Sequence, residues 1–143
     1  MTLTAHIAGR QRGKSFARCP DQVRSALTEG GLDVIDTIGT LARDHRAGHV
    51  LVAGDVFDNL DTGERILVQA LSRMSRASSS WWLVPGNHAR TDGLWSRARA
   101  QAPANVHVPD RAEAVPLGDS AWLLPAPLQH RRMRDVPTRA GAG

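Results

Sequence analysis

The fold is decided by two short stretches: 52–58, which reads Val-Ala-Gly-Asp-Val-Phe-Asp, and 84–88, which reads Val-Pro-Gly-Asn-His. Each is the end of an apolar strand followed directly by side chains that bind metal ions. In an open α/β sheet, ligands gather beyond the carboxyl ends of the strands. We therefore expect Asp55 and Asn87 to meet in one cleft at that edge of the sheet.

The residue types in these stretches suit the hydrolysis of a phosphoester. Gly54 and Gly86 permit sharp turns because they lack a Cβ atom. Asp55 is placed to bridge two cations, and Asn87 offers a neutral carbonyl oxygen to one of them. Two divalent ions about 3.5–4 Å apart hold a phosphate, activate water and neutralise the leaving oxygen. Histidine titrates near neutrality, so His88 can protonate the departing alkoxide.

The pattern G-D-x-x-D followed by G-N-H resembles the calcineurin-like metallophosphoesterase superfamily. The sequence at 13–18, 50–58 and 122–127 is similar to the DNA-repair exonuclease branch of that superfamily, the SbcD-like proteins, and the resemblance extends over nearly the whole chain. It implies an α/β sandwich with a two-metal centre of Mn2+ or Fe2+. The implied activity is phosphodiester hydrolysis, in this branch at DNA ends, and an ATPase subunit is the implied protein partner.

The resemblance implies a role for each matched residue. Asp55 would bridge the two metals, Asn87 would bind one of them, and His88 would be the catalytic histidine. Three further motif residues are expected to shape the loops: Gly54, Asp58 and Gly86. An isolated G-D-x-x-D is more often a turn or a helix cap, because short motifs occur by chance. The partnering G-N-H is what favours the metal site.

The sequence departs from the family where the first strand ends. The family carries Asp-x-His there, whereas this chain has Gly9 and Gln11, flanked by Arg10 and Arg12. The carbonyl oxygen of Gln11 could still coordinate weakly, but the two arginines oppose a cation. Ala89 stands where the family has an acidic residue after G-N-H. The first metal site is therefore expected to be broken.

The family's later histidine motif, G-H-x-H, is also missing from this sequence. Loss of a single supporting partner typically reduces metal affinity or activity by about 10–100-fold. Loss of several direct ligands should therefore abolish tight binding of two metals. We expect the chain, alone, to be impaired or inactive.

Composition leaves a non-catalytic alternative open. The chain has 18 basic and 14 acidic residues, a net charge of +4, and all of its basic residues but Lys14 are arginine. Arginine pairs well with phosphates, which is compatible with a nucleic-acid partner. A degenerate module that binds DNA or an ATPase subunit is therefore the alternative, although +4 is a modest charge.

A nucleotide-binding loop is a weaker alternative. Residues Ala8 to Ser15 fit a relaxed Walker A pattern with alanine at the first glycine position. Such a loop should lead directly into a helix whose N-terminus faces the phosphate. Here the segment Phe16–Cys19 intervenes before Pro20, which disfavours this interpretation.

Alternating apolar patterns predict an α/β fold that begins β-α-β-α-β, with a parallel sheet. Strands are expected at 2–8, 49–53, 81–84 and near 105–108, 113–117 and 121–124. A basic loop is expected at 9–19, and a helical stretch from Pro20 is expected to be interrupted at Gly30-Gly31. A second helix should follow an Asp61 cap, and Asp92 is expected to cap a short third helix that runs through Gln101.

The apolar positions of the two long helices are expected to pack on the sheet, as are the tryptophans. These positions are Leu32, Ile35, Ile38, Leu41, Ala42, Ile66, Leu67, Ala70, Leu71, Met74, Trp81, Trp82, Trp95 and Trp122. No pair of histidines has tight metal-binding spacing, so surface or rim positions are expected for His45, His49, His107 and His130.

We expect one partial metallophosphoesterase-like domain at 1–129 and a basic, flexible tail at 130–143. The tail holds Arg131, Arg132 and Arg134. The single cysteine, Cys19, fits a reducing compartment. No apolar run approaches the ~18–20 residues that cross a bilayer, so a cytoplasmic protein is expected. The oligomeric state stays open.

Overall fold

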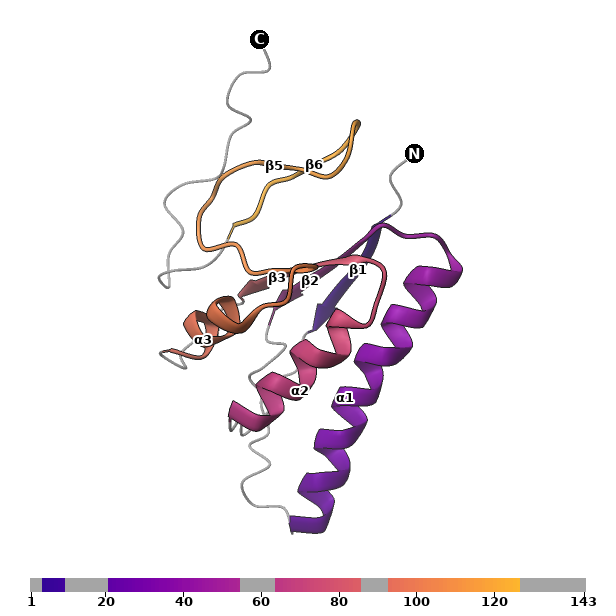
Figure 1. Cartoon of the computed structure of the whole chain (residues 1–143), viewed down its shortest axis with the longest axis vertical. Helices are drawn as coiled ribbons and strands as arrows, with labels where there is room; N and C mark the ends of the chain where they lie inside the picture. Colours follow the sequence, from indigo (N-terminus) through magenta and orange to yellow (C-terminus); the bar gives the residue numbers. More distant parts are fainter. Residues whose placement is uncertain (1–3, 10–20, 55–63, 86–92, 127–143) are drawn as a thin grey trace.

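The computed structural model describes residues 4–9, 21–54, 64–85 and 93–126 (Figure 1). Its elements, in chain order, are β1 (Thr4–Gly9), α1 (Asp21–Asp44), β2 (His49–Gly54), α2 (Glu64–Ser75), β3 (Ser80–Pro85), α3 (Leu94–Gln101), β4 (Val106–His107), β5 (Val115–Pro116) and β6 (Trp122–Leu123). The predicted helices and strands are present, and the last three strands are shorter than the sequence patterns indicated. The N-cap of α3 is Gly93 and not the expected Asp92, while the expected Asp61 cap and the basic loop after Gly9 lie outside the described residues.

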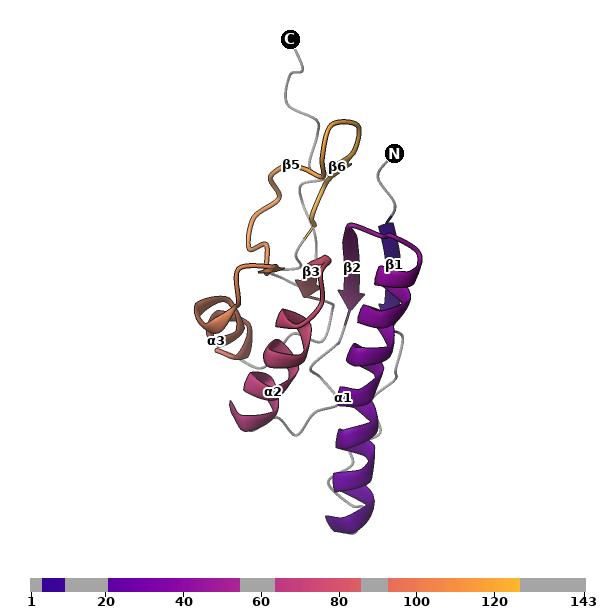
Figure 2. The same ribbon diagram turned by 45° about the vertical axis from the view of Figure 1, so that its right-hand side comes forward.

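Four strands form one parallel sheet in the order β1-β2-β3-β4. Figures 1 and 2 show α1 and α2 lying side by side over one face of this sheet. The short strands β5 and β6 pair with each other in an antiparallel ribbon. The predicted α/β class and the parallel sheet are therefore confirmed. The complete metallophosphoesterase-like sandwich stays a prediction.

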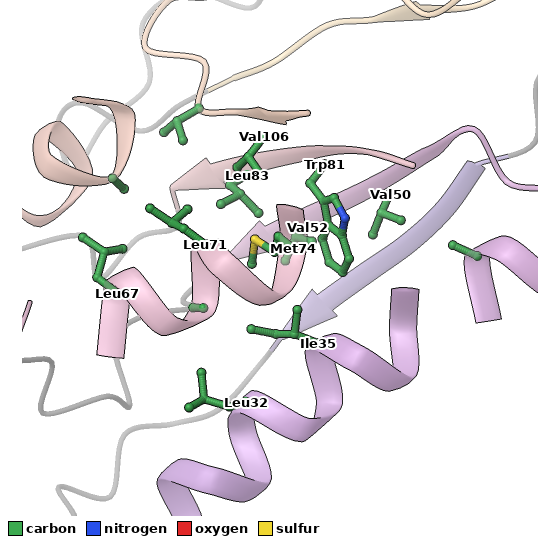
Figure 3. Close-up of a cluster of buried hydrophobic side chains, with 14 of the residues drawn as sticks. Leu32, Ile35, Val50, Val52, Leu67, Leu71, Met74, Trp81, Leu83 and Val106 are labelled. Atoms are coloured by element: carbon green, nitrogen blue, oxygen red, sulfur yellow. The ribbon is translucent and has the colours of Figure 1, made fainter. Parts of the chain in front are cut away.

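The core lies between the sheet and the two long helices (Figure 3). Because side chains alternate across a strand, Val50 and Val52 of β2 share this face with Trp81 of β3. Four side chains of α2 are buried against it, as predicted: Leu67, Ala70, Leu71 and Met74. Ile66 and Trp95 are partly buried and pack against the same cluster.

Helix α1 continues through Gly30-Gly31, so the predicted interruption is wrong. Glycine in a helix interior costs about 1 kcal/mol relative to alanine. That cost is outweighed because Leu32, Ile35 and Ala42 are all buried in the core. Tertiary packing, not local propensity, sets the length of this helix.

Two predicted core positions are on the surface. The exposed fraction of Leu41 is 52% and that of Trp122 is 51%. Leu41 points away from the sheet because Ala42 takes the buried position beside it. Trp122 lies on β6, which pairs with β5 in a two-stranded ribbon, and the described part of the chain covers only about half of its side chain. Trp81 and Trp82 are buried as expected.

Substitution of the glycine pair should stabilise the chain. A Cβ atom at Gly30 or Gly31 would meet nothing within 4 Å. We therefore expect Gly30→Ala and Gly31→Ala each to raise the free energy of unfolding by about 0.5–1 kcal/mol, measured by urea denaturation. Gly39→Ala is the control, because its Cβ would lie 3.3 Å from the Ala77 Cβ and should gain less. A lower midpoint for both variants of the pair would contradict the continuous helix.

The opposite face of the sheet is covered in part by the chain that follows β6. Leu51, Ala53 and Val84 alternate with the core residues and lie on this second face. Together with Val52 and residues 123–126 they line a pocket of about 270 Å³. Among the residues that the structure describes, no helix is long and apolar enough to cross a membrane.

Candidate active site at the strand ends

Three parallel strands end side by side. Gly9 of β1 is the register partner of Gly54 of β2, and Gly54 is in turn the partner of Pro85 of β3. Neighbouring strands in a sheet lie about 4.8 Å apart. The chain therefore leaves the sheet at three adjacent points along one edge, immediately before the segments that carry the candidate ligands.

The candidate side chains themselves lie outside the described residues. This holds for Gln11, Asp55, Asp58, Gly86, Asn87 and His88, and only Gly54 is described, as the last residue of β2. Since Asp55 follows Gly54 and Gly86 follows Pro85 in the chain, the two motifs start from paired backbone positions. The convergence of the motif starts agrees with the sequence analysis, and the positions of the side chains stay predictions.

The described residues offer no substitute metal site. Within 4–9, 21–54, 64–85 and 93–126, no group of three or more His, Cys, Asp or Glu side chains could hold a metal ion. His45 is exposed, and His49 and His107 are half-buried, in agreement with the expected rim positions. His130 lies outside the described residues. The candidate metal ligands therefore remain those of the segments after β1, β2 and β3.

An apolar pocket lies behind the strand ends. Its walls are the carboxyl-terminal halves of β2 and β3 and the segment Leu123–Ala126. Pro125 is buried there. The sequence predicted only a strand at residues 121–124, because an apolar pattern alone does not show which face of which sheet these residues cover. The pocket is lined by apolar residues and brings no charged side chain to the carboxyl-terminal halves of β2 and β3.

A strong charge cluster lies elsewhere, between the two long helices. Arg73 of α2 donates to Asp33 and Asp36 of α1 at 2.7 Å each, and to Glu29 at 2.6 Å. Its side chain is only 17% exposed. The hydrogen bond to Asp33, with the charges of Glu29 and Asp36, raises the pKa of Arg73 further above its ordinary value. This arginine joins two helices and is not available to bind a phosphate.

The Walker A interpretation gains no support from the described residues. Ala8 and Gly9 are the last residues of β1, and the helix that follows begins at Asp21. Residues 10–20 lie outside the described part of the chain. A phosphate-binding loop needs a helix N-terminus at the loop, and the described helix starts six positions beyond Ser15.

In this parallel α/β sheet, the candidate metal ligands belong to the segments that follow the strand ends. Such an arrangement suits phosphoester hydrolysis. Comparison with known proteins gives a more particular result. The chain is 25% identical over 134 residues to the SbcD subunit of the SbcCD nuclease of Bacillus subtilis (strain 168), and the alignment covers 82% of this chain. The similarity is distant, and it agrees with the motif resemblance to the calcineurin-like metallophosphoesterases.

The chain spans only 33% of the length of that curated relative. No protein-family model matches the sequence. No solved structure matches it. The family is therefore indicated by one distant similarity together with the G-D-x-x-D and G-N-H motifs.

Proposed function

We propose that the chain is a degenerate relative of SbcD-type nucleases, with an incomplete two-metal phosphodiesterase centre at the ends of β1, β2 and β3. The observation that carries the proposal is the register row Gly9, Gly54 and Pro85. Because these three residues are neighbours in the sheet, the candidate segments that follow them leave the sheet at adjacent points. The similarity to a protein of a nuclease complex supports the chemistry assigned to these segments.

The oxygen ligands that these segments offer are proposed to suffice for one divalent cation but not for two. Asp55 and Asn87 supply a carboxylate and an amide oxygen, which suit a divalent ion. Gly9 has no side chain to offer a second ion, and Gln11 offers only a neutral oxygen. When bound, divalent ions activate water and neutralise the charge on phosphate. We propose that this chain holds Mn2+ or Fe2+ weakly and at one position only.

The remaining roles belong to the protein's own groups. His88 is proposed to hold a proton near the leaving oxygen, where a neutral imidazole accepts and an imidazolium donates. Gly54 and Gly86 are proposed to turn the chain so that Asp55 and Asn87 face each other. DNA ends are the proposed substrate class, a cytoplasmic location is proposed with it, and an ATPase subunit is the proposed partner, since the similar protein is itself named as one part of a complex.

The test is a calorimetric titration with Mn2+, paired with hydrolysis of a simple aryl phosphodiester. We expect weak Mn2+ binding that Asp55→Ala removes, and no turnover above the buffer rate. Asp119→Ala is the matched control, because Asp119 is an exposed carboxylate on the β5–β6 ribbon. It should leave Mn2+ binding unchanged.

Two outcomes would contradict the proposal in different ways. Robust turnover that Asp55→Ala abolishes would mean that the centre is complete. Mn2+ binding that Asp55→Ala leaves intact would mean that the strand ends hold no metal. The second outcome favours the non-catalytic module, whose signature is DNA binding that weakens steeply as salt rises.

A further inference from the structure

Helix α1 turns two of its three sides toward the rest of the described fold. Successive residues of a helix are about 100° apart around its axis, so residues of different kinds fall on different sides. The core side carries the buried residues Leu32, Ile35 and Ala42. The side toward α2 carries the three carboxylates that Arg73 binds. Figure 2 shows α1 on the β1 side of the helix layer, so its third side faces away from α2 and past β1.

The third side of α1 is apolar. It carries Val34, Ile38 and Leu41, at the i, i+4 and i+7 spacing that puts side chains on one face of a helix. The exposed fractions of Val34 and Leu41 are 54% and 52%, and Ile38 is partly buried against the core. The nearby carboxylate of Asp44 pairs with Arg43 of the same helix. We call Val34, Ile38 and Leu41 the α1 stripe.

Strand β1 lies under this side of α1 and has an open edge. Among the residues that the structure describes, β1 pairs only with β2. An open edge presents unpaired N–H and C=O groups with which another strand can pair. The other edge of the sheet is protected by its shortness, because β4 has only two residues. In contrast, β1 has six residues and contains no proline, Lys, Arg, Asp or Glu, so it lacks the features that commonly block edge pairing.

The α1 stripe and the β1 edge have their centres at the same height. Helix α1 runs antiparallel to β1 (Figure 2) and ends at Asp44, shortly before His49, the register partner of Thr4. The middle of β1 lies about 8 Å from Thr4, which corresponds to about five or six helical residues. Counted back from Asp44, this height falls close to Ile38. One two-fold axis normal to the sheet therefore brings both features against their own copies.

We propose that the β1 edge and the α1 stripe together bind a second copy of this chain. The two β1 strands pair antiparallel and join the sheets, and the two α1 helices pack side by side, with Val34 against Leu41 of the second copy. Self-pairing suits this face because the α1 stripe and β1 bring no charged Lys, Arg, Asp or Glu side chain against its like. Antiparallel β1 strands point in opposite directions, so the two candidate active sites lie at opposite ends of the joined sheet.

The size of the face indicates a weak dimer. The edge of β1 is about 20 Å long, and the sheet and helix layers together are about 20 Å thick. The outline of the face is therefore about 400 Å², below the ~800 Å² per partner of a standard interface. We expect monomer and dimer to exchange, with a dissociation constant in the micromolar range or above.

Sedimentation of the full chain from about 10 μM to about 1 mM tests the dimer. We expect the mean mass to rise from that of one chain toward that of two. Val34→Glu combined with Leu41→Glu places charges in the helix pair and should abolish this rise. Both positions are exposed, so far-UV circular dichroism should show an unchanged fold. Val68→Glu is the matched control, because Val68 is 46% exposed on α2, outside the proposed face, and this variant should dimerise as the wild type does.

Cysteine cross-linking tests the antiparallel arrangement, in chains whose Cys19 is replaced by serine. A mixture of Val34→Cys and Leu41→Cys chains should form an intermolecular disulfide under mild oxidation, because the two positions face each other. Either variant alone should cross-link little. Its two cysteines would lie about 10 Å apart along the helix axes, beyond the ~7 Å between Cα atoms that a disulfide spans.

Amide hydrogen exchange reports on the strands. Alternate amides of β1 should exchange more slowly as the protein concentration rises, because pairing of the open edges protects them. Four results would overturn the proposal: a wild-type chain that stays monomeric at about 1 mM, a dimer that survives the paired glutamates, cross-linking of Val34→Cys alone as readily as of the mixture, and β1 exchange that is independent of concentration. None of these results bears on metal binding by Asp55, so the proposed function is tested separately.

Discussion

Trp81→Ala should lower the free energy of unfolding by about 3–5 kcal/mol, the range for deletion of a large buried aromatic side chain. Trp81 is 1% exposed and is the largest fully buried side chain among the residues that the structure describes. It stands on β3 and points into the core between the sheet and α1 and α2 (Figure 3). Single domains have total stabilities of only about 5–15 kcal/mol. Urea denaturation of this variant should therefore show a partly unfolded population in buffer.

Two variants separate burial from residue type. Trp122→Ala removes the same atoms from a half-exposed position on β6 and should change stability by no more than about 0.5 kcal/mol. In Trp81→Phe most of the core volume remains, and the indole N–H, which is buried with no hydrogen-bond partner among the described residues, is removed. The phenylalanine variant should therefore lose much less than the alanine variant. Equal losses at 81 and 122 would contradict the packing.

The periodicity of apolar residues was sufficient to predict the order of the elements. Helix α2 shows why: its buried positions recur at helical spacing, so Leu67, Leu71 and Met74 fall on one face. The misses have a common physical origin. Leu41 and Trp122 are apolar, but burial depends on what the rest of the fold brings to cover a position. The break expected at Gly30-Gly31 ignored the packing of Leu32 beyond it.

The candidate site could be located from the sequence only as far as the strand ends. Strands predicted to be parallel must have their carboxyl ends on one edge, and the register of Gly54 with Pro85 agrees. Register and cross-strand contacts are not encoded in any local pattern. The stack of Trp82 with His107 joins residues 25 positions apart, and the pocket wall at residues 123–126 lies far along the chain from β2. No local signal could have found either.

Asn105→Asp is expected to be strongly destabilising, because the amide of Asn105 ties three carbonyl groups together. Its Nδ2 carries two N–H groups and lies within hydrogen-bond distance of three carbonyl oxygens, those of Met74 at 3.0 Å and of Ala77 and Ser79 at 3.1 Å each, so one N–H is shared between two of them. These carbonyls belong to the end of α2 and to the turn that enters β3. The Asn105 backbone oxygen also accepts from the Trp81 N–H at 2.7 Å. One residue thus fixes the connection from α2 to β3 against the start of β4.

A carboxylate at this position has no donor and faces three carbonyl oxygens. The Met74 carbonyl keeps the Ala77 N–H as a donor, but the hydrogen bonds from the Asn105 amide to Ala77 and Ser79 are lost in a part-buried place. Such a loss costs about 1–3 kcal/mol, and the repulsion of the charge adds to it. Chemical denaturation at pH 7 measures the effect. At pH 3 part of the stability should return relative to the wild type, because a protonated carboxyl group supplies one O–H donor and its folded-state pKa is raised by the facing carbonyls.

The same chemical change at an exposed amide separates this prediction from a general effect of added charge. Gln101 Nε2 donates to Glu64 Oε1 at 3.1 Å on the surface, between α3 and α2. Gln101→Glu also replaces a donor with a charge beside an acceptor, but water can solvate both groups. It should change stability by about 0.5 kcal/mol or less. Comparable losses in the two variants would mean that the turn before β3 does not depend on the Asn105 amide.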